Sequence, residues 1–111
     1  MTESYIDQIS NIISNAFQAD RSAGIGGVAQ FLLRDSESDS WSLQVIDQQA
    51  IAKPGIDGYA NVTVTMTIQD CTQLFEGKLD PAKAFMQGRI KLSGDMAFAM
   101  KLISLFNLGK V

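Results

Sequence analysis

Residues 60–68 read Ala-Asn-Val-Thr-Val-Thr-Met-Thr-Ile, with an apolar residue at every even position and a polar residue at every odd position. Side chains alternate between the two faces of a β-strand, so this pattern predicts a strand with one buried face and one face of threonines. Upstream, the apolar run at 28–34 and the alternating residues 41–45 predict a hairpin, and a third strand is expected at 50–53, before Pro54. The stretch therefore belongs to a sheet.

An amphipathic helix is predicted before these strands. Apolar residues recur at three- and four-residue spacing over 6–17, which gives a helix with a single apolar stripe. Ser4 and Asp7 resemble a capping box, and the glycines within 24–27 are expected to end the element.

Three helices and one strand are predicted after the threonine strand. Asp70 is expected to cap the first helix, and Asp80, followed directly by a proline, to cap the second. Residues 89–93 alternate as a last strand, and Asp95 is expected to cap a closing helix over 96–108.

The order of these elements predicts the fold class. Strands and helices do not alternate regularly, which disfavours a doubly wound parallel sheet and favours an α+β layer of helices on a mostly antiparallel sheet. At 111 residues, of which 46% are hydrophobic and 19% charged, residues 1–111 are expected to form a single globular domain. The longest apolar stretch is shorter than the roughly 20 residues that span a bilayer.

Catalytic and metal-binding side chains are scarce. The chain has no histidine and one cysteine, Cys71, so imidazole metal sites, an intramolecular disulfide and the usual base beside a nucleophile are missing. We expect no enzyme, no metal and no cofactor. An enzyme using a carboxylate such as Asp70 or Asp80 is the weaker alternative, because both residues are explained as helix caps. The first residues lack the pattern of a secretory signal, which predicts a cytoplasmic location.

Charge is distributed unevenly along the chain. Residues 1–77 hold 3 basic and 10 acidic side chains, and residues 78–111 hold 6 basic and 2 acidic ones. The basic part could contact anionic headgroups or a phosphorylated ligand, although an ordinary solvated surface is the simpler interpretation. The sequence lacks a dense basic run, so nucleic acid is not an expected partner.

The closing stretch has more apolar surface than one helix face needs. Residues 96–108 read Met-Ala-Phe-Ala-Met-Lys-Leu-Ile-Ser-Leu-Phe-Asn-Leu, with Lys101 as the only charge. A helix that is apolar all round needs cover on both sides, from the core, a ligand, a membrane or another subunit. Four of the six phenylalanines and three of the five methionines lie between Phe75 and Phe106. Methionine adapts to irregular partners, as a lipid cavity would require, but from the helix alone an ordinary core is the better interpretation of these residues.

Residues 80–102 read Asp-Pro-Ala-Lys-Ala-Phe-Met-Gln-Gly-Arg-Ile-Lys-Leu-Ser-Gly-Asp-Met-Ala-Phe-Ala-Met-Lys-Leu and closely resemble the sterol carrier protein 2 family. The similarity extends back through 75–79 and the strand at 60–67, so that it covers about residues 57–106. The resemblance implies a five-stranded, mostly antiparallel sheet covered by helices around an apolar tunnel. It also implies non-catalytic carriage of one lipid, such as a fatty acid, acyl-CoA, sterol or phospholipid.

The resemblance further implies which side chains face the lipid. The apolar positions are Phe31, Leu33, Leu43, Val64, Met66, Phe75, Phe85, Met86, Ile90, Met96, Met100, Ile103 and Phe106. Gln87 is the polar exception, and its amide is expected either to orient a headgroup or to cap the end of a short helix. Phe98, Leu102 and Leu105 are expected to pack on the domain instead.

Several partners and one alternative function remain open. The expected partner is a lipid, a transient membrane contact is compatible with it, and the protein is expected to be a monomer or a homodimer. In the alternative, the closing helix seals a homodimer that serves as an interaction module with a vestigial tunnel. The last residues, 107–111, do not match the peroxisomal signal of many eukaryotic relatives, and no fused catalytic domain is seen, so a stand-alone microbial form is expected.

Overall fold

The computed structural model describes residues 4–106. Short 3-10 turns at Ala19–Arg21 and Glu37–Asp39 lie between the larger elements. In chain order these elements are α1 (Tyr5–Ala16), β1 (Gly27–Leu33), β2 (Trp41–Ile46), β3 (Gln49–Pro54), β4 (Val62–Met66), α2 (Ile68–Phe75), α3 (Pro81–Met86), β5 (Lys91–Gly94) and α4 (Met96–Leu105).

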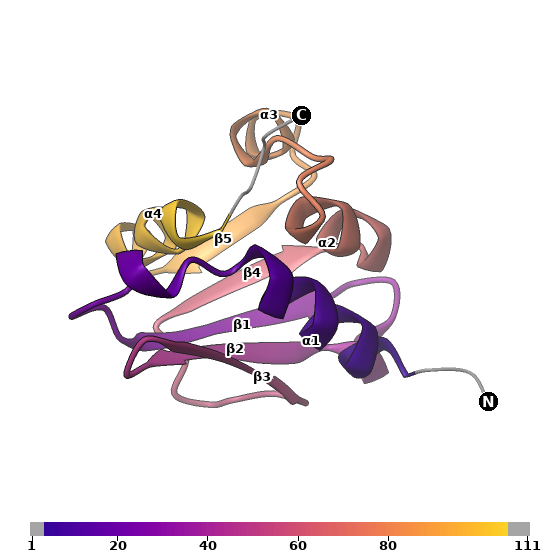
Figure 1. Ribbon diagram of the computed structural model, residues 1–111. Helices are drawn as coiled ribbons and strands as arrows, with labels where there is room; N and C mark the ends of the chain where they lie inside the picture. Colours follow the sequence, from indigo (N-terminus) through magenta and orange to yellow (C-terminus); the bar gives the residue numbers. More distant parts are fainter. Residues whose placement is uncertain (1–3, 107–111) are drawn as a thin grey trace.

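The strands form one five-stranded sheet in the order β3-β2-β1-β4-β5. Strands β1 and β4 pair in parallel, and the other three pairs are antiparallel. Figure 1 shows the helices on one face of this sheet, with α3 standing farthest from it. Helix α1 packs on β3 and α2, and α4 packs on β4. The prediction of an α+β fold with a mostly antiparallel sheet under helices is confirmed.

The connection from β3 to β4 crosses the open face of the sheet and is held there by Gln30. The side chain of Gln30 is buried, and its Nε2 donates to the carbonyl oxygens of Trp41 and Gly55 at 3.0 and 3.1 Å. Its Oε1 accepts the backbone N–H of Asp57 at 2.6 Å. Because buried polar groups are costly unless they are paired, this glutamine fixes the crossover that makes β4 parallel to β1.

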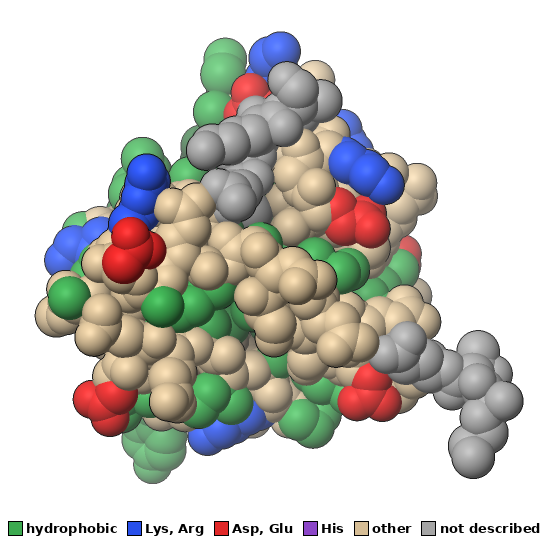
Figure 2. All heavy atoms as spheres, viewed as in Figure 1, with side chains coloured by type: hydrophobic (Ala, Val, Ile, Leu, Met, Phe, Trp, Pro, Cys, Tyr) green, Lys and Arg blue, Asp and Glu red, His purple; other side chains and the backbone are tan. Residues whose placement is uncertain are grey.

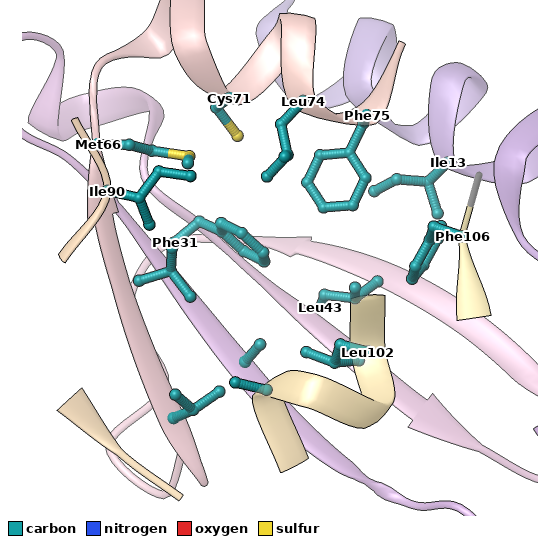
Figure 3. Close-up of a cluster of buried hydrophobic side chains, with 14 of the residues drawn as sticks. Ile13, Phe31, Leu43, Met66, Cys71, Leu74, Phe75, Ile90, Leu102 and Phe106 are labelled. Atoms are coloured by element: carbon teal, nitrogen blue, oxygen red, sulfur yellow. The ribbon is translucent and has the colours of Figure 1, made fainter. Parts of the chain in front are cut away.

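The core lies between the helices and the inward face of the sheet. Alternation places Phe31 and Trp41 opposite each other on β1 and β2, with ring centroids 4.5 Å apart and nearly parallel. Phe75 of α2 contacts both rings, and the ring of Phe106 lies 5.3 Å from that of Phe75. Figure 3 shows Phe31, Phe75 and Phe106 converging from the sheet, α2 and the end of α4. This aromatic cluster joins β1 and β2 to α2 and to the end of α4.

Of the three aspartates that were predicted to cap helices, two are confirmed and one is wrong. The Asp80 carboxylate accepts the N–H of Ala82, and the Asp95 carboxylate accepts that of Phe98. Helix α2, however, is capped by Thr67, whose Oγ1 accepts the N–H of Asp70 at 3.1 Å. Asp70 therefore lies inside the first turn, where its carboxylate is free to bind another partner.

The ends of the first and last helices also differ from the prediction. Ser4 precedes α1, but its hydroxyl donates to the Asp7 carboxylate at 2.8 Å, so the expected capping box does not form. Helix α1 ends at Ala16 because the next residue, Phe17, forms a β-bridge with Phe106. Helix α4 ends at Leu105, and the predicted helical residues 107 and 108 lie outside the described residues.

Candidate functional site

A cavity of about 650 Å³ lies between the inward face of the sheet and helices α2, α3 and α4. Strands β1, β2, β4 and β5 and the segment before β5 also contribute to its wall. Every lining residue except Asp80 is apolar. The lining residues are Phe31, Leu43, Val64, Leu74, Phe75, Asp80, Pro81, Ala82, Phe85, Met86, Ile90, Leu92, Met96, Ala99, Met100, Leu102, Ile103 and Phe106.

The strand side of the cavity follows from the alternation of the sequence. Phe31 and Val64 are register partners on β1 and β4 and point to the helix-covered face. Leu33 and Met66 are register partners on the same face, two residues farther along, and both are fully buried without lining the cavity. Two residues of a strand span about 7 Å, which is enough to move a side chain from the cavity wall into the packed core.

Helix α4 divides its apolar surface between the core and the cavity. Met96, Ala99, Met100 and Ile103 follow helical spacing and line the cavity, whereas Phe98 and Leu105 are buried against the domain without lining it. Leu102, expected only to pack on the domain, is buried and also lines the cavity. Figure 3 shows Leu102 of α4 and Leu43 of β2 facing each other across this part of the structure. Helix α4, which is apolar all round, thus contacts the packed core on one side and the cavity on the other.

Four of the large apolar lining side chains are also open to solvent. Phe85 and Met86 of α3 are 52% and 84% exposed, and Met96 and Met100 of α4 are 45% and 65% exposed. Large apolar groups that are both exposed and continuous with a cavity mark an entrance rather than a packed wall. We call these four residues the rim.

Gln87 lies beside the rim but outside the cavity wall. It is exposed, and it occupies the C-terminal capping position of α3, where its backbone N–H donates to the carbonyl of Lys83 at 2.9 Å. Its position at the end of the short helix is compatible with the capping role, and both roles expected of its side-chain amide remain predictions.

An ion pair that the sequence did not predict ties the end of α3 to α2. Arg89 Nη2 lies 2.6 Å from Asp70 Oδ1, and Arg89 Nε lies 3.3 Å from Asp70 Oδ2. The Asp70 carboxylate is largely buried, and the hydrogen bonds from Arg89 hold its pKa below the usual value. The backbone N–H of Arg89 also donates to the Ala84 carbonyl. This pair anchors the segment between α3 and β5.

The polar groups near the cavity have structural partners. Asp80, its one charged lining residue, accepts the N–H groups of Ala82 and Lys83 at 2.9 and 3.5 Å. Cys71 is buried behind the wall, and burial raises the pKa of its thiol to about 12, so the thiol is neutral. Residues 4–106 contain no cluster of three or more metal-ligating side chains, and none of their helices is long and apolar enough to span a bilayer.

Sequence reasoning missed seven lining residues. Two of them carried a usable signal, since Leu92 alternates with exposed neighbours on β5 and Ala99 lies one helical turn from both Met96 and Ile103. The others depend on how the short helices meet. The seven are Leu74, Asp80, Pro81, Ala82, Leu92, Ala99 and Leu102.

Residues 6–107 match the sequence model of the SCP-2 sterol transfer family. The chain belongs to this family. Sterol carrier protein 2 of Rattus norvegicus is 37% identical over 84 residues, which are 73% of this chain and 15% of the rat protein. Hydroxysteroid dehydrogenase-like protein 2 of Bos taurus is 32% identical over 108 residues, which are 92% of this chain and 25% of the bovine protein. The SCP-2 domain therefore spans a small part of these relatives.

Solved SCP-2 structures share the fold. The NMR structure of palmitated SCP2L2 from Aedes aegypti superimposes with a TM-score of 0.62 at 27% identity, over 86% of this chain and 91% of that one. The SCP-2 resemblance of the sequence and the SCP-2 fold are thus both confirmed. Lipid binding is the general activity that membership of this family supports.

Proposed function

We propose that this SCP-2 domain binds a single lipid in the cavity and carries it without changing it chemically. The observation that carries the proposal is the cavity itself, about 650 Å³ of space with an apolar wall and an exposed apolar rim. Protein interiors are normally close-packed, so a cavity of this size is not an ordinary packing defect. Its volume lies within the range of small-molecule binding sites, about 300–1,000 Å³. On this proposal the cavity is the apolar tunnel that the family resemblance implied.

The apolar wall favours a ligand with a hydrocarbon chain. SCP2L2 from Aedes aegypti is palmitated, and that structure supports an acyl chain as the ligand here. Each buried methylene contributes about 0.8 kcal/mol, so ten of them give roughly 8 kcal/mol before the costs of association. With Asp80 engaged as a helix cap, the wall offers few groups for headgroup recognition, so selectivity among lipids is expected to be broad.

The arrangement of α4 favours a carrier over a dimerising module. Phe98, Leu105 and Phe106 are buried within the chain itself, and the ring of Phe106 packs on Phe17 and Phe75. The helix therefore needs no second subunit to cover most of its apolar surface. The carboxylates once considered for catalysis are engaged in an ion pair and a helix cap, which supports a non-catalytic role. We propose the cytoplasm as the location of this activity.

Lipid occupancy tests the proposal directly. Native mass spectrometry of the purified protein is expected to show one lipid per chain, and a fluorescent fatty acid is expected to bind and to be displaced saturably by unlabelled fatty acid. A protein that carries no lipid and shows no saturable displacement would contradict the carrier function.

A matched pair of alanine substitutions locates the lipid. Ala99→Phe adds a ring at a buried lining position, whereas Ala97→Phe adds the same ring at an exposed position of the same helix that does not line the cavity. Only Ala99→Phe is expected to lower the affinity for the fluorescent fatty acid. If Ala99→Phe fails to fold, Ile103→Trp fills the cavity from a half-buried position. Equal affinity in the filled and control variants would place the lipid elsewhere.

A further inference from the structure

The rim is an apolar surface formed by two helices that are separate in the sequence. Phe85 and Met86 belong to α3, and Met96 and Met100 belong to α4, yet all four border the same cavity. They therefore surround a single opening instead of being scattered over the surface. A contiguous exposed apolar patch of this kind indicates contact with an apolar phase or partner.

The same two helices carry positive charge without negative charge. Helix α3 contains Lys83 and helix α4 contains Lys101, and neither helix contains an aspartate or glutamate. Both lysines are exposed, and within residues 4–106 neither forms an ion pair with a carboxylate. By contrast, Lys78 lies 3.6 Å from Glu76, and Arg89 is engaged by Asp70. Figure 2 shows hydrophobic side chains and lysine or arginine side chains, with some acidic side chains beside them, along the α3 and α4 side of the molecule.

The rest of the chain has the opposite charge. Residues 4–77 carry nine acidic and three basic side chains, whereas residues 78–106 carry two acidic and five basic ones. The two acidic groups of the second part, Asp80 and Asp95, accept backbone N–H groups at helix starts. An anionic surface would attract the side of α3 and α4 and repel the remainder, which selects one orientation of approach.

We propose that the rim, together with Lys83 and Lys101, docks the domain on an anionic lipid bilayer. The rim side chains enter the boundary between headgroups and acyl chains, and the two ammonium groups lie at the level of the lipid phosphates, as long lysine side chains permit. The opening of the cavity then faces the bilayer. A second copy of the chain is a poorer occupant, because two such faces would bring like charges together. The inference goes beyond the proposed carrier function and concerns the exposed entrance of the same cavity.

Vesicle flotation tests the charged part of the surface. The wild-type protein is expected to float with vesicles of phosphatidylcholine mixed with phosphatidylglycerol and to bind pure phosphatidylcholine vesicles much more weakly. Each lysine near an anionic bilayer strengthens binding about fivefold, so K83Q/K101Q is expected to bind roughly 30-fold more weakly. The control K53Q/K91Q removes two exposed lysines from β3 and β5, outside the rim, and is expected to bind as the wild type does.

Tryptophan substitutions test insertion of the rim. Phe85→Trp is expected to shift its fluorescence to shorter wavelengths when the mixed vesicles are added. Tyr59→Trp, at a 94% exposed position in the loop between β3 and β4, is expected to show no shift. Met86→Ser is expected to weaken flotation, whereas Ile56→Ser, at a 74% exposed position in the same loop as Tyr59, is not.

Several outcomes would overturn the docking surface. The first is an equal loss of vesicle binding in K83Q/K101Q and K53Q/K91Q. The second is a Phe85→Trp emission spectrum that the vesicles leave unchanged. The third is a dimer in sedimentation that Met86→Ser dissociates. Displacement of a fluorescent fatty acid without vesicles provides a separate measurement. Flotation that depends on the rim, in a protein that binds no fatty acid, would refute the carrier function and retain the docking surface. Fatty-acid binding without flotation would refute the docking surface and retain the carrier function.

Discussion

Leu33 and Leu43 are matched leucines on the helix-covered face of the sheet. Both are fully buried, but Leu43 lines the cavity and Leu33 does not. Leu43→Ala removes three carbon atoms beside space that already exists, so the expected loss is the transfer free energy alone, about 2.4 kcal/mol. Leu33→Ala opens a new void in packed core, and such substitutions cost about 2.7–5.0 kcal/mol. Without lipid, the core variant should therefore be the less stable one.

Lipid affinity should respond in the opposite order. The Leu43 side chain faces the space that we assign to the ligand, so loss of one or two methylene contacts should weaken fatty-acid binding about fourfold to fifteenfold. Leu33→Ala should leave the affinity unchanged once the folded fraction is taken into account. The assays are urea unfolding of the lipid-free protein and displacement of a fluorescent fatty acid. An affinity loss in Leu33→Ala with none in Leu43→Ala would refute the assignment of the cavity as the lipid site.

Two further predictions concern the supports of the cavity. Gly94→Ala should lower the free energy of unfolding in urea by more than about 3 kcal/mol, because φ is +110° and the new Cβ would lie 2.6 Å from the Asn61 carbonyl oxygen. The control Gly58→Ala, which has open space around it, should not lower it by this amount. Arg89 keeps the pKa of Asp70 below its ordinary 3.8, so the stability that the ion pair contributes is complete above pH 3.8 and is lost as the pH falls through the lowered pKa. Asp70→Asn should therefore reduce the acid dependence of unfolding followed by circular dichroism. An unchanged acid transition in this variant would argue against a stabilising role of the pair.

The strands and two of the helix starts were predictable because their signals are local. Alternation in residues 60–68 sets the buried face of β4 without knowledge of any other strand. Asp80 and Asp95 accept N–H groups two or three residues ahead, so each cap is encoded within one turn. The same reasoning failed at Asp70, because its partner, Arg89, lies 19 residues away and takes the carboxylate while Thr67 supplies the cap.

The cavity could be only partly predicted from the sequence. By their alternation pattern, four apolar residues of β1, β2 and β4 face the helices, namely Leu33, Leu43, Val64 and Met66. Leu43 and Val64 line the cavity, whereas Leu33 and Met66 are buried in the packed core. The pattern specifies which face is apolar, but the position of a void along that face depends on where the covering helices stop. That information is tertiary, since α3 stands away from the sheet (Figure 1) and lines the cavity together with α2 and α4.

Helix α4 shows how an apolar surplus in the sequence becomes a cavity. A helix that is apolar all round would be covered entirely by core in a larger protein. Within residues 4–106, however, α1 covers the side of the sheet near β3, and only the short helices α2 and α3 line the cavity together with α4. Phe98 and Leu105 use one side of α4 for the core, and Met96, Met100 and Ile103 face the space that the short helices do not fill. Residues at the open end of that space remain exposed and form the rim. The cavity, its entrance and the docking surface thus follow from the same excess of apolar surface over covering structure.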